Sequence, residues 1–329
     1  MTKRDMSRHI SVGLAISVLT LSTSIADADE FPTKPVRFIV PFAPGGPVDM
    51  LARLVGQEMA RSFGQQVVID NRPGANGIIG TDIVAKAAPN GYTVLMGNVG
   101  PIAVNVSLYR KLPYDPLKDF APVSMVARSP LILVSNPALP VTSVNELIRL
   151  AKSRPGQLTY GTAGAGSGTH LSMELFKTMA GVTGIEHIPY KGIAPALSDL
   201  VAGQIPLVMS NIVPVQPLVK AARLRGLAVT SRQRSPALPE VPTMIEAGLP
   251  GFEAIVWFGV LAPADTPKEI VAKLNNEIGR ALSLPKIAEQ LSAIGSAVWP
   301  MTPDAFTVYI KAEVEKWRIV IRNAKVSLE

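Results

Sequence analysis

The stretch VPFAPGGPVDMLAR, from Val40 to Arg53, leads from an apolar segment into a helical pattern through prolines and a pair of glycines. A second stretch, YGTAGAGSGTHLSMELF from Tyr160 to Phe176, has the same organisation. In open α/β sheets, ligands bind beyond the carboxyl ends of strands, where glycine-rich loops lead into helices. Amides at such helix starts carry a partial positive charge. The two loops therefore predict a shared site for a small anion.

Short β-branched or apolar runs alternate along the chain with segments of helical periodicity, which is typical of a largely parallel sheet covered by helices. The sequence therefore predicts an α/β protein. Helical patterns cover residues 48–63 and 77–88, and Gly64 follows the first as a stop. The ranges with strand character are 36–42, 66–70, 92–97, 131–135, 158–160, 185–190, 205–209 and 227–230.

The 329-residue chain is longer than one hydrophobic core usually serves, so we expect two lobes. After one more strand at residues 256–262 the chain is mainly helical, which leaves too few strands for a third sheet. We expect this segment to return to the first lobe, so that strands near 123–127 and 256–262 cross between the lobes. The predicted boundaries are 29–127 plus 255–329 for lobe 1 and 128–254 for lobe 2, with a cleft between them.

The first 28 residues have the pattern of a secretory signal peptide. Lys3, Arg4 and Arg8 precede an apolar run over residues 10–21, and Ala26-Asp27-Ala28 has the form of a cleavage site. The apolar run is shorter than the ~20 residues of a spanning helix. The chain has no cysteine, which excludes disulfides and a lipid-modified cysteine. We expect a protein that is free in the periplasm if the host has two membranes.

The two loops offer amides and hydroxyls but no lysine or arginine. Gly45 and Gly46 allow the backbone to approach a ligand, and Asp49 has the side chain of an N-cap. In the second loop the hydroxyls of Thr162, Ser167 and Thr169 can donate to an anion, and His170 falls in the first helical turn. Phe42 and Trp257 could cover an apolar ligand body, although a core role is the more frequent fate of an aromatic residue.

The sequence gives little support for binding of nucleic acid, dinucleotides or metals, or for a catalytic triad. The formal charge of +7 is mild, and the basic residues are scattered with few aromatics, so we exclude nucleic acid as a partner. The pair Gly164-x-Gly166 matches the first two glycines of a dinucleotide-binding motif, but Thr169 occupies the position of the third glycine. His170 and His187 are the histidines outside the signal segment, and neither has a neighbour at metal-binding spacing. We therefore expect no metal and no cofactor, although a triad of Ser167, His170 and an acid stays open at the level of sequence.

Many ordered blocks of the chain resemble the extracytoplasmic binding proteins of tripartite tricarboxylate transporters, also called Bug receptors. They include PTKPVRFIVPFAPGGPVDMLAR (32–53), VVIDNRPGANGIIG (67–80), YGTAGAGSGTHLSMELF (160–176), PYKGIAPALSDLVAGQI (189–205) and KWRIVIRNA (316–324). The resemblance implies a two-lobed, type II-like periplasmic binding fold that closes on a small organic carboxylate and delivers it to integral-membrane transporter subunits. It implies a non-catalytic, monomeric protein.

The resemblance also implies which residues contact the ligand. The first loop, from Phe42 to Asp49, and the second, from Thr162 to His170, would hold one carboxylate through backbone amides, with Asn98 and Asn211 shaping the rest of the pocket. The implied contact residues are Phe42, Ala43, Pro44, Gly45, Gly46, Asp49, Asn98, Thr162, Ala163, Gly166, Ser167, Thr169, His170 and Asn211.

Two residues depart from the pattern of the family. Pro47 stands where the family often has a glycine or another small residue, which stiffens the first loop and removes an amide donor. Ser210 stands where an acidic residue is common, which makes the distal end of the pocket less negative. The sequence leaves open which carboxylate is bound. It also leaves open a periplasmic sensor for a signalling receptor and, with less support, a hydrolase that uses the same cleft.

Overall fold

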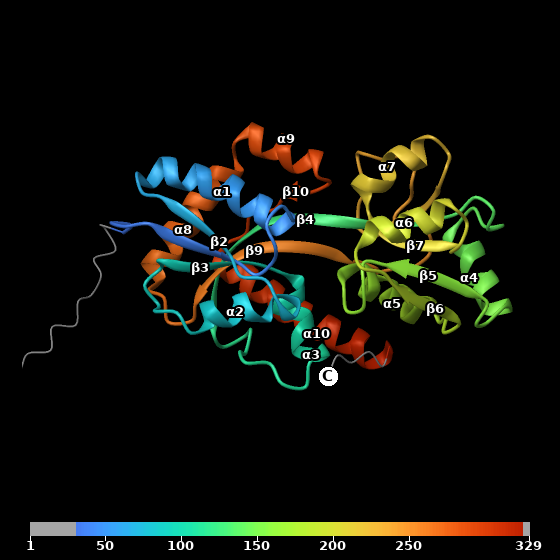
Figure 1. Cartoon of the computed structure of the whole chain (residues 1–329), viewed down its shortest axis with the longest axis horizontal. Coiled ribbons are helices and arrows are strands. Elements are labelled where there is room, and N and C mark those ends of the chain that lie inside the picture. Colours follow the sequence, from blue (N-terminus) through green and yellow to red (C-terminus); the bar gives the residue numbers. More distant parts are fainter. Residues whose placement is uncertain (1–30, 325–329) are drawn as a thin grey trace, which may run out of the picture.

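The computed structural model describes residues 31–324. The predicted signal peptide, residues 1–28, lies outside the described residues. Figure 1 shows two bodies of helices packed around strands, with the long strands β4 (Phe120–Ser135) and β9 (Ile255–Pro263) side by side between them. The chain is therefore an α/β protein with two lobes, as the alternation of strand and helix patterns predicts.

The sheet of the first lobe has a parallel part and an antiparallel part. Strand β1 (Val36–Val40) pairs in parallel with β2 (Val67–Asn71) and β3 (Thr93–Asn98). Strand β9 lies antiparallel between β3 and β4, and the short β10 (Ala297–Val298) pairs with β4. A segment from the last quarter of the chain thus occupies the middle of the first lobe.

The sheet of the second lobe is built on the far end of β4. Strand β7 (Leu207–Asn211) pairs antiparallel with residues 131–135 of β4, and β8 (Arg225–Val229) pairs antiparallel with residues 132–135. Strand β5 (Leu158–Thr162) lies parallel between β7 and β6 (Ile185–Pro189). The segments predicted as separate strands at 123–127 and 131–135 are therefore one strand. The lobe boundaries stay a prediction, because the hydrogen-bonded sheet is continuous through β4.

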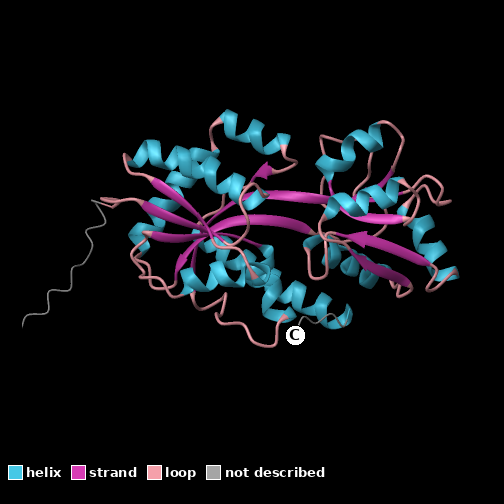
Figure 2. Ribbon diagram, viewed as in Figure 1, coloured by secondary structure: helices cyan, strands magenta, loops and turns pink. Residues whose placement is uncertain are grey.

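Helices cover both faces of the sheets (Figure 2). Helix α1 begins where the first quoted loop ends, and α5 begins where the second ends, as the sequence predicts. The helical segments are α1 (Pro47–Phe63), η1 (Ala75–Gly77), α2 (Ile78–Ala85), η2 (Gly100–Val104), α3 (Asn105–Leu108), α4 (Val144–Ser153), α5 (Gly168–Ala180), α6 (Ile193–Val201), α7 (Ile212–Lys220), α8 (Lys268–Leu282), α9 (Pro285–Ala293) and α10 (Pro303–Ala324).

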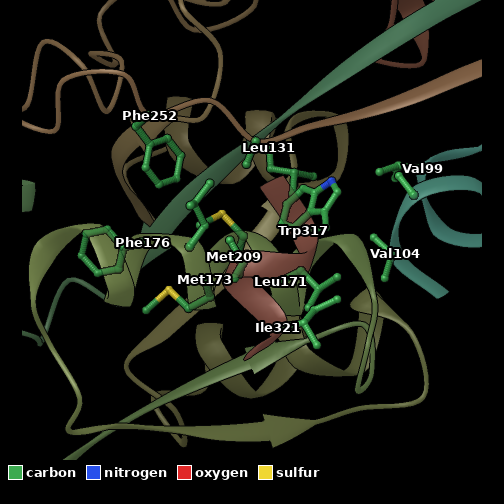
Figure 3. Close-up of a cluster of buried hydrophobic side chains, with 14 of the residues drawn as sticks. Val99, Val104, Leu131, Leu171, Met173, Phe176, Met209, Phe252, Trp317 and Ile321 are labelled. Atoms are coloured by element: carbon green, nitrogen blue, oxygen red, sulfur yellow. The ribbon is translucent and has the colours of Figure 1, made fainter. Parts of the chain in front are cut away.

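One hydrophobic cluster extends through both lobes. It includes Leu95 of the first sheet, Tyr160 and Phe176 of the second lobe, and Trp317 and Ile321 of α10. Figure 3 shows Trp317 and Ile321 packed with side chains of α5 and β7. The C-terminal end of α10 therefore packs against the second lobe, although the helix begins beside the first.

Helix starts follow their sequence signals in part. The Ser143 hydroxyl accepts the amide of Glu146 and caps α4. Thr243 and Glu246 exchange both bonds of a capping box, but they close a turn and no helix continues from them. Thr266 and Glu269 also have the spacing of a capping box, but α8 has no side-chain cap and the buried Thr266 hydroxyl has no partner in the described chain. Hydroxyl and carboxylate spacing therefore predicts local bonds better than it predicts helices.

Candidate functional site

A cavity of about 190 Å³ lies between the two lobes, at the start of α5 and the ends of β3 and β1. The first sheet, the loop before α5 with the start of that helix, and the C-terminal helix α10 contribute to it. The lining residues are Phe42, Asn76, Asn98, Val99, Gly100, Val104, Gly166, Ser167, Gly168, Leu171, Ser172, Ile255, Val256 and Trp317. The cavity thus lies at the carboxyl ends of strands, where the glycine-rich loops predict a ligand.

The second loop is held by its own hydroxyls. Ser167 is the N-cap of α5, and its hydroxyl accepts the amide of His170 at 3.3 Å. The same hydroxyl donates to the carbonyl of Gly164 at 2.7 Å. The amide of Ala163 donates to the Thr169 hydroxyl at 3.0 Å. These hydroxyls shape the loop, while the first amides of α5 have no partner within the helix and can serve a ligand.

Two stacked histidines lie behind the second loop. The rings of His170 and His187 are 3.9 Å apart, and the Gly166 amide donates to Nδ1 of His170 at 3.0 Å. The Thr162 hydroxyl lies 2.6 Å from Nε2 of His187. Burial lowers the pKa of each histidine to about 4, aided in His187 by its neighbour His170. Both rings are therefore neutral near pH 7 and act as neutral supports for the loop.

The first loop enters the cavity through Phe42, whereas Gly46 and the exposed residues Ala43, Pro44 and Gly45 do not line it. The expectation that Asp49 caps α1 is wrong. Gly46 is the N-cap, and Asp49 lies in the first turn, where its carboxylate accepts the Gly45 amide at 3.0 Å and Arg53 Nε at 2.9 Å. The hydrogen bond from Arg53 holds the pKa of Asp49 below its usual value. The positive end of α1 is thus already paired with a carboxylate of the chain itself, that of Asp49.

The two asparagines predicted at strand ends have different positions. Asn98 lines the cavity, and its side-chain oxygen accepts the Gly100 amide at 3.2 Å. Asn211 ends β7 and precedes α7 but is not part of the lining. Trp257 is fully buried and donates to Glu313 at 3.0 Å, so the core role of this residue is confirmed.

Four of the predicted contact residues therefore line one cavity: Phe42, Asn98, Gly166 and Ser167. The others lie outside its lining, namely Ala43, Pro44, Gly45, Gly46, Asp49, Thr162, Ala163, Thr169, His170 and Asn211. Sequence reasoning missed Asn76, Leu171 and Trp317 as lining residues. Asn76 and Leu171 lie within or beside the quoted glycine-rich blocks and could have been found there. Trp317 has no local signal, because α10 reaches the cavity through tertiary packing.

Comparisons with known proteins place this arrangement in a family. The family model described as the tripartite tricarboxylate transporter family receptor (TctC) matches residues 51–326. The chain belongs to this receptor family. BugT of Bordetella pertussis is 40% identical over 327 residues, which cover 99% of this chain and 100% of BugT.

Solved structures of the receptor family have the same fold. The R. palustris protein Rpa4515, solved with adipate, is 43% identical with a TM-score of 0.76, and the match covers 90% of this chain and 99% of that one. MatC of Rhodopseudomonas palustris, solved with bound malate, is 36% identical with a TM-score of 0.73, covering 88% and 100% of the two chains. The chain is therefore a receptor of the TctC family and not an enzyme.

Across residues 31–324, no helix has the length and apolar character needed to cross a membrane. In the same residues, no group of three or more histidines and carboxylates has the arrangement of a metal site.

Proposed function

We propose that this receptor binds a small organic carboxylate in the cavity between its lobes, in the periplasm, and presents it as a monomer to the membrane subunits of a tripartite tricarboxylate-type transporter. The observation that supports the proposal is the cavity itself, which is lined by the start of α5, beyond the end of β5. Relatives with this fold hold adipate and malate, both of which are carboxylates.

In the proposed complex, a carboxylate accepts the amides of Gly168 and Thr169 at the start of α5, where the helix dipole favours negative charge. Ser167 and Gly166 fix the position of these amides, and the loop residues Thr162, Ala163 and His170 hold the backbone in place. Asn98 and Phe42 contact the ligand from the first lobe. The edges of the cleft are shaped by the remaining predicted residues, which are Ala43, Pro44, Gly45, Gly46, Asp49 and Asn211.

Movement of the lobes about β4 and β9 would complete the site. Both strands cross the space between the lobes, so a small change in their twist alters the distance from Phe42 to Ser167. A ligand shifts this equilibrium only by its differential affinity for the closed form. We propose that the ligand-closed form is the one that membrane subunits recognise.

The test is a thermal-shift titration of the chain from residue 29 with a panel of carboxylates and the corresponding amides. A ligand at 100 times its dissociation constant adds about 2.7 kcal/mol to the free energy of unfolding. We expect stabilisation by a set of acids and none by their amides. Ser167→Ala should weaken the response, whereas the matched control Ser198→Ala, on α6 away from the cavity, should not. Stabilisation by amides and acids alike would contradict the proposed site.

A further inference from the structure

We infer, resting on the proposed function, that the ligand is a monocarboxylate with an apolar body of about the size of a benzene ring, and that Trp317 forms the wall that selects this body. The inference concerns the class of carboxylate, which the family and the sequence leave open. It is carried by the residue types around the cavity.

The described residues that line the cavity lack charged side chains. The lining residues from the second loop are two glycines and Ser167. The first loop contributes Phe42, while the start of α1 is neutralised by Asp49. The start of α5 therefore offers one group of free amide donors to the cavity. This single group of donors can bind one carboxylate.

Most of the cavity lining beyond the start of α5 is apolar. Val99, Val104, Leu171 and Trp317 line the cavity and also belong to the large hydrophobic cluster, each at most 5% exposed. Figure 3 shows Val99 and Val104, which precede and end η2, on one side, and Leu171 of α5 and Trp317 of α10 on the other. Ile255 and Val256 of β9 extend the same surface. A second carboxylate placed here would lose its hydration without gaining a cation.

The polar groups on the first-lobe side are neutral amides. The oxygen of Asn98 is occupied by the Gly100 amide, which leaves the Asn98 NH₂ group for a ligand. The NH₂ group of Asn76 donates to Asn105 at 2.9 Å, which leaves the Asn76 oxygen as an acceptor. One donor and one acceptor suit a neutral substituent such as a hydroxyl group better than a second anionic charge.

The size of the cavity also suits an aromatic ring. A protein cavity of ~150 Å³ lined by apolar side chains holds one benzene molecule. The cavity between the lobes, at about 190 Å³, therefore has room for a ring and a carboxylate. Trp317 is an indole held in place by a hydrogen bond of 3.0 Å from its Nε1 to Glu313. A fixed aromatic wall favours a flat ring over a flexible chain, because stacked aromatic pairs gain more than their buried area provides.

The experiment uses matched pairs of probes that differ in one carboxylate. Protein freed of bound small molecules by unfolding and refolding is titrated calorimetrically with 4-methylbenzoate and terephthalate, and with hexanoate and adipate. We expect each monocarboxylate to bind at least about tenfold more tightly than its dicarboxylate partner, because the second charge is desolvated without a partner. 4-Methylbenzoate should also bind more tightly than hexanoate.

The variant Trp317→Leu tests the wall. It should reduce the affinity for 4-methylbenzoate at least about fivefold more than the affinity for hexanoate. The matched control Trp299→Leu removes a tryptophan that packs on Tyr309 outside the cavity, and should leave this ratio unchanged. A ratio that does not change in Trp317→Leu would overturn the assignment of the wall.

The outcomes separate the inference from the proposed function. Tighter or equal binding of either dicarboxylate would overturn the inference while the carboxylate receptor stands. Binding of neither member of either pair would overturn the inference, and the wider panel of carboxylates would then decide the proposed function. Tight binding of 4-methylbenzamide, the uncharged analogue, would overturn the carboxylate itself.

Discussion

Replacement of Glu313 is expected to destabilise the protein through two tryptophans at once. The buried carboxylate oxygen Oε2 accepts the indole N–H of Trp257 and that of Trp317, each at 3.0 Å. Glu313→Leu keeps much of the volume but leaves both buried donors without an acceptor. Each unsatisfied donor costs about 1–3 kcal/mol, so the free energy of unfolding should fall by about 2–6 kcal/mol. Glu313→Gln keeps one acceptor oxygen for both donors and should lose about 2 kcal/mol, roughly 1 kcal/mol for each hydrogen bond whose acceptor becomes neutral.

Urea unfolding followed by far-ultraviolet circular dichroism measures these losses without depending on tryptophan fluorescence. The loss from Glu313→Leu should shrink by about 1–3 kcal/mol in a Trp257→Phe background, because one of the two stranded donors is then absent. Equal losses for the Leu and Gln variants would refute the reasoning. So would strict additivity of Glu313→Leu with Trp257→Phe.

Three further outcomes are expected. Because the folded pKa of His170 is about 4 and the unfolded value about 6.5, the unfolded state binds more protons between these values. The free energy of unfolding should therefore fall as pH drops from about 6.5 to about 4, by up to about 3 kcal/mol from His170 alone, and urea titrations of His170→Gln should show a flatter profile. In Gly168→Ala the new Cβ would lie 3.0 Å from Val256 Cγ2, and both residues line the cavity. Calorimetry should therefore show that the affinity for a carboxylate falls about tenfold. The control variant Gly279→Ala has open space around its new Cβ and should bind the carboxylate normally. Thr266→Val should leave the melting temperature unchanged or raise it, because the buried hydroxyl has no partner to lose.

The sequence predicts the fold well because its signals are local. Strand and helix patterns and the glycine stop at residue 64 act within a few residues, and Gly64 does adopt the left-handed conformation, with φ 64°. The two glycine-rich loops are also local, and their position at strand ends follows from the α/β architecture. For the same reason Ser167, which caps its own helix, could be placed at the start of α5 from the sequence.

The site was harder to predict because it depends on contacts between distant segments. Trp317 reaches the cavity only because the end of α10 packs on α5, more than a hundred residues earlier in the chain. The role of Asp49 depends on Arg53 and on the Gly45 amide, and capping statistics do not distinguish this first-turn position from an N-cap. The glycine-rich loop before α1 thus has the sequence of a ligand-binding loop, although the positive end of α1 is already paired with the Asp49 carboxylate.

The position of β9 has a consequence for how the chain folds. This strand is made late in synthesis, yet it lies in the middle of the first sheet, where Phe258 pairs with Asn98. Until residue 263 is available, β3 and β4 lack the neighbour that joins them, and their edges stay unpaired. Such long-range pairing makes folding slow. A nascent chain with this topology therefore cannot complete its first lobe until most of the chain has been made.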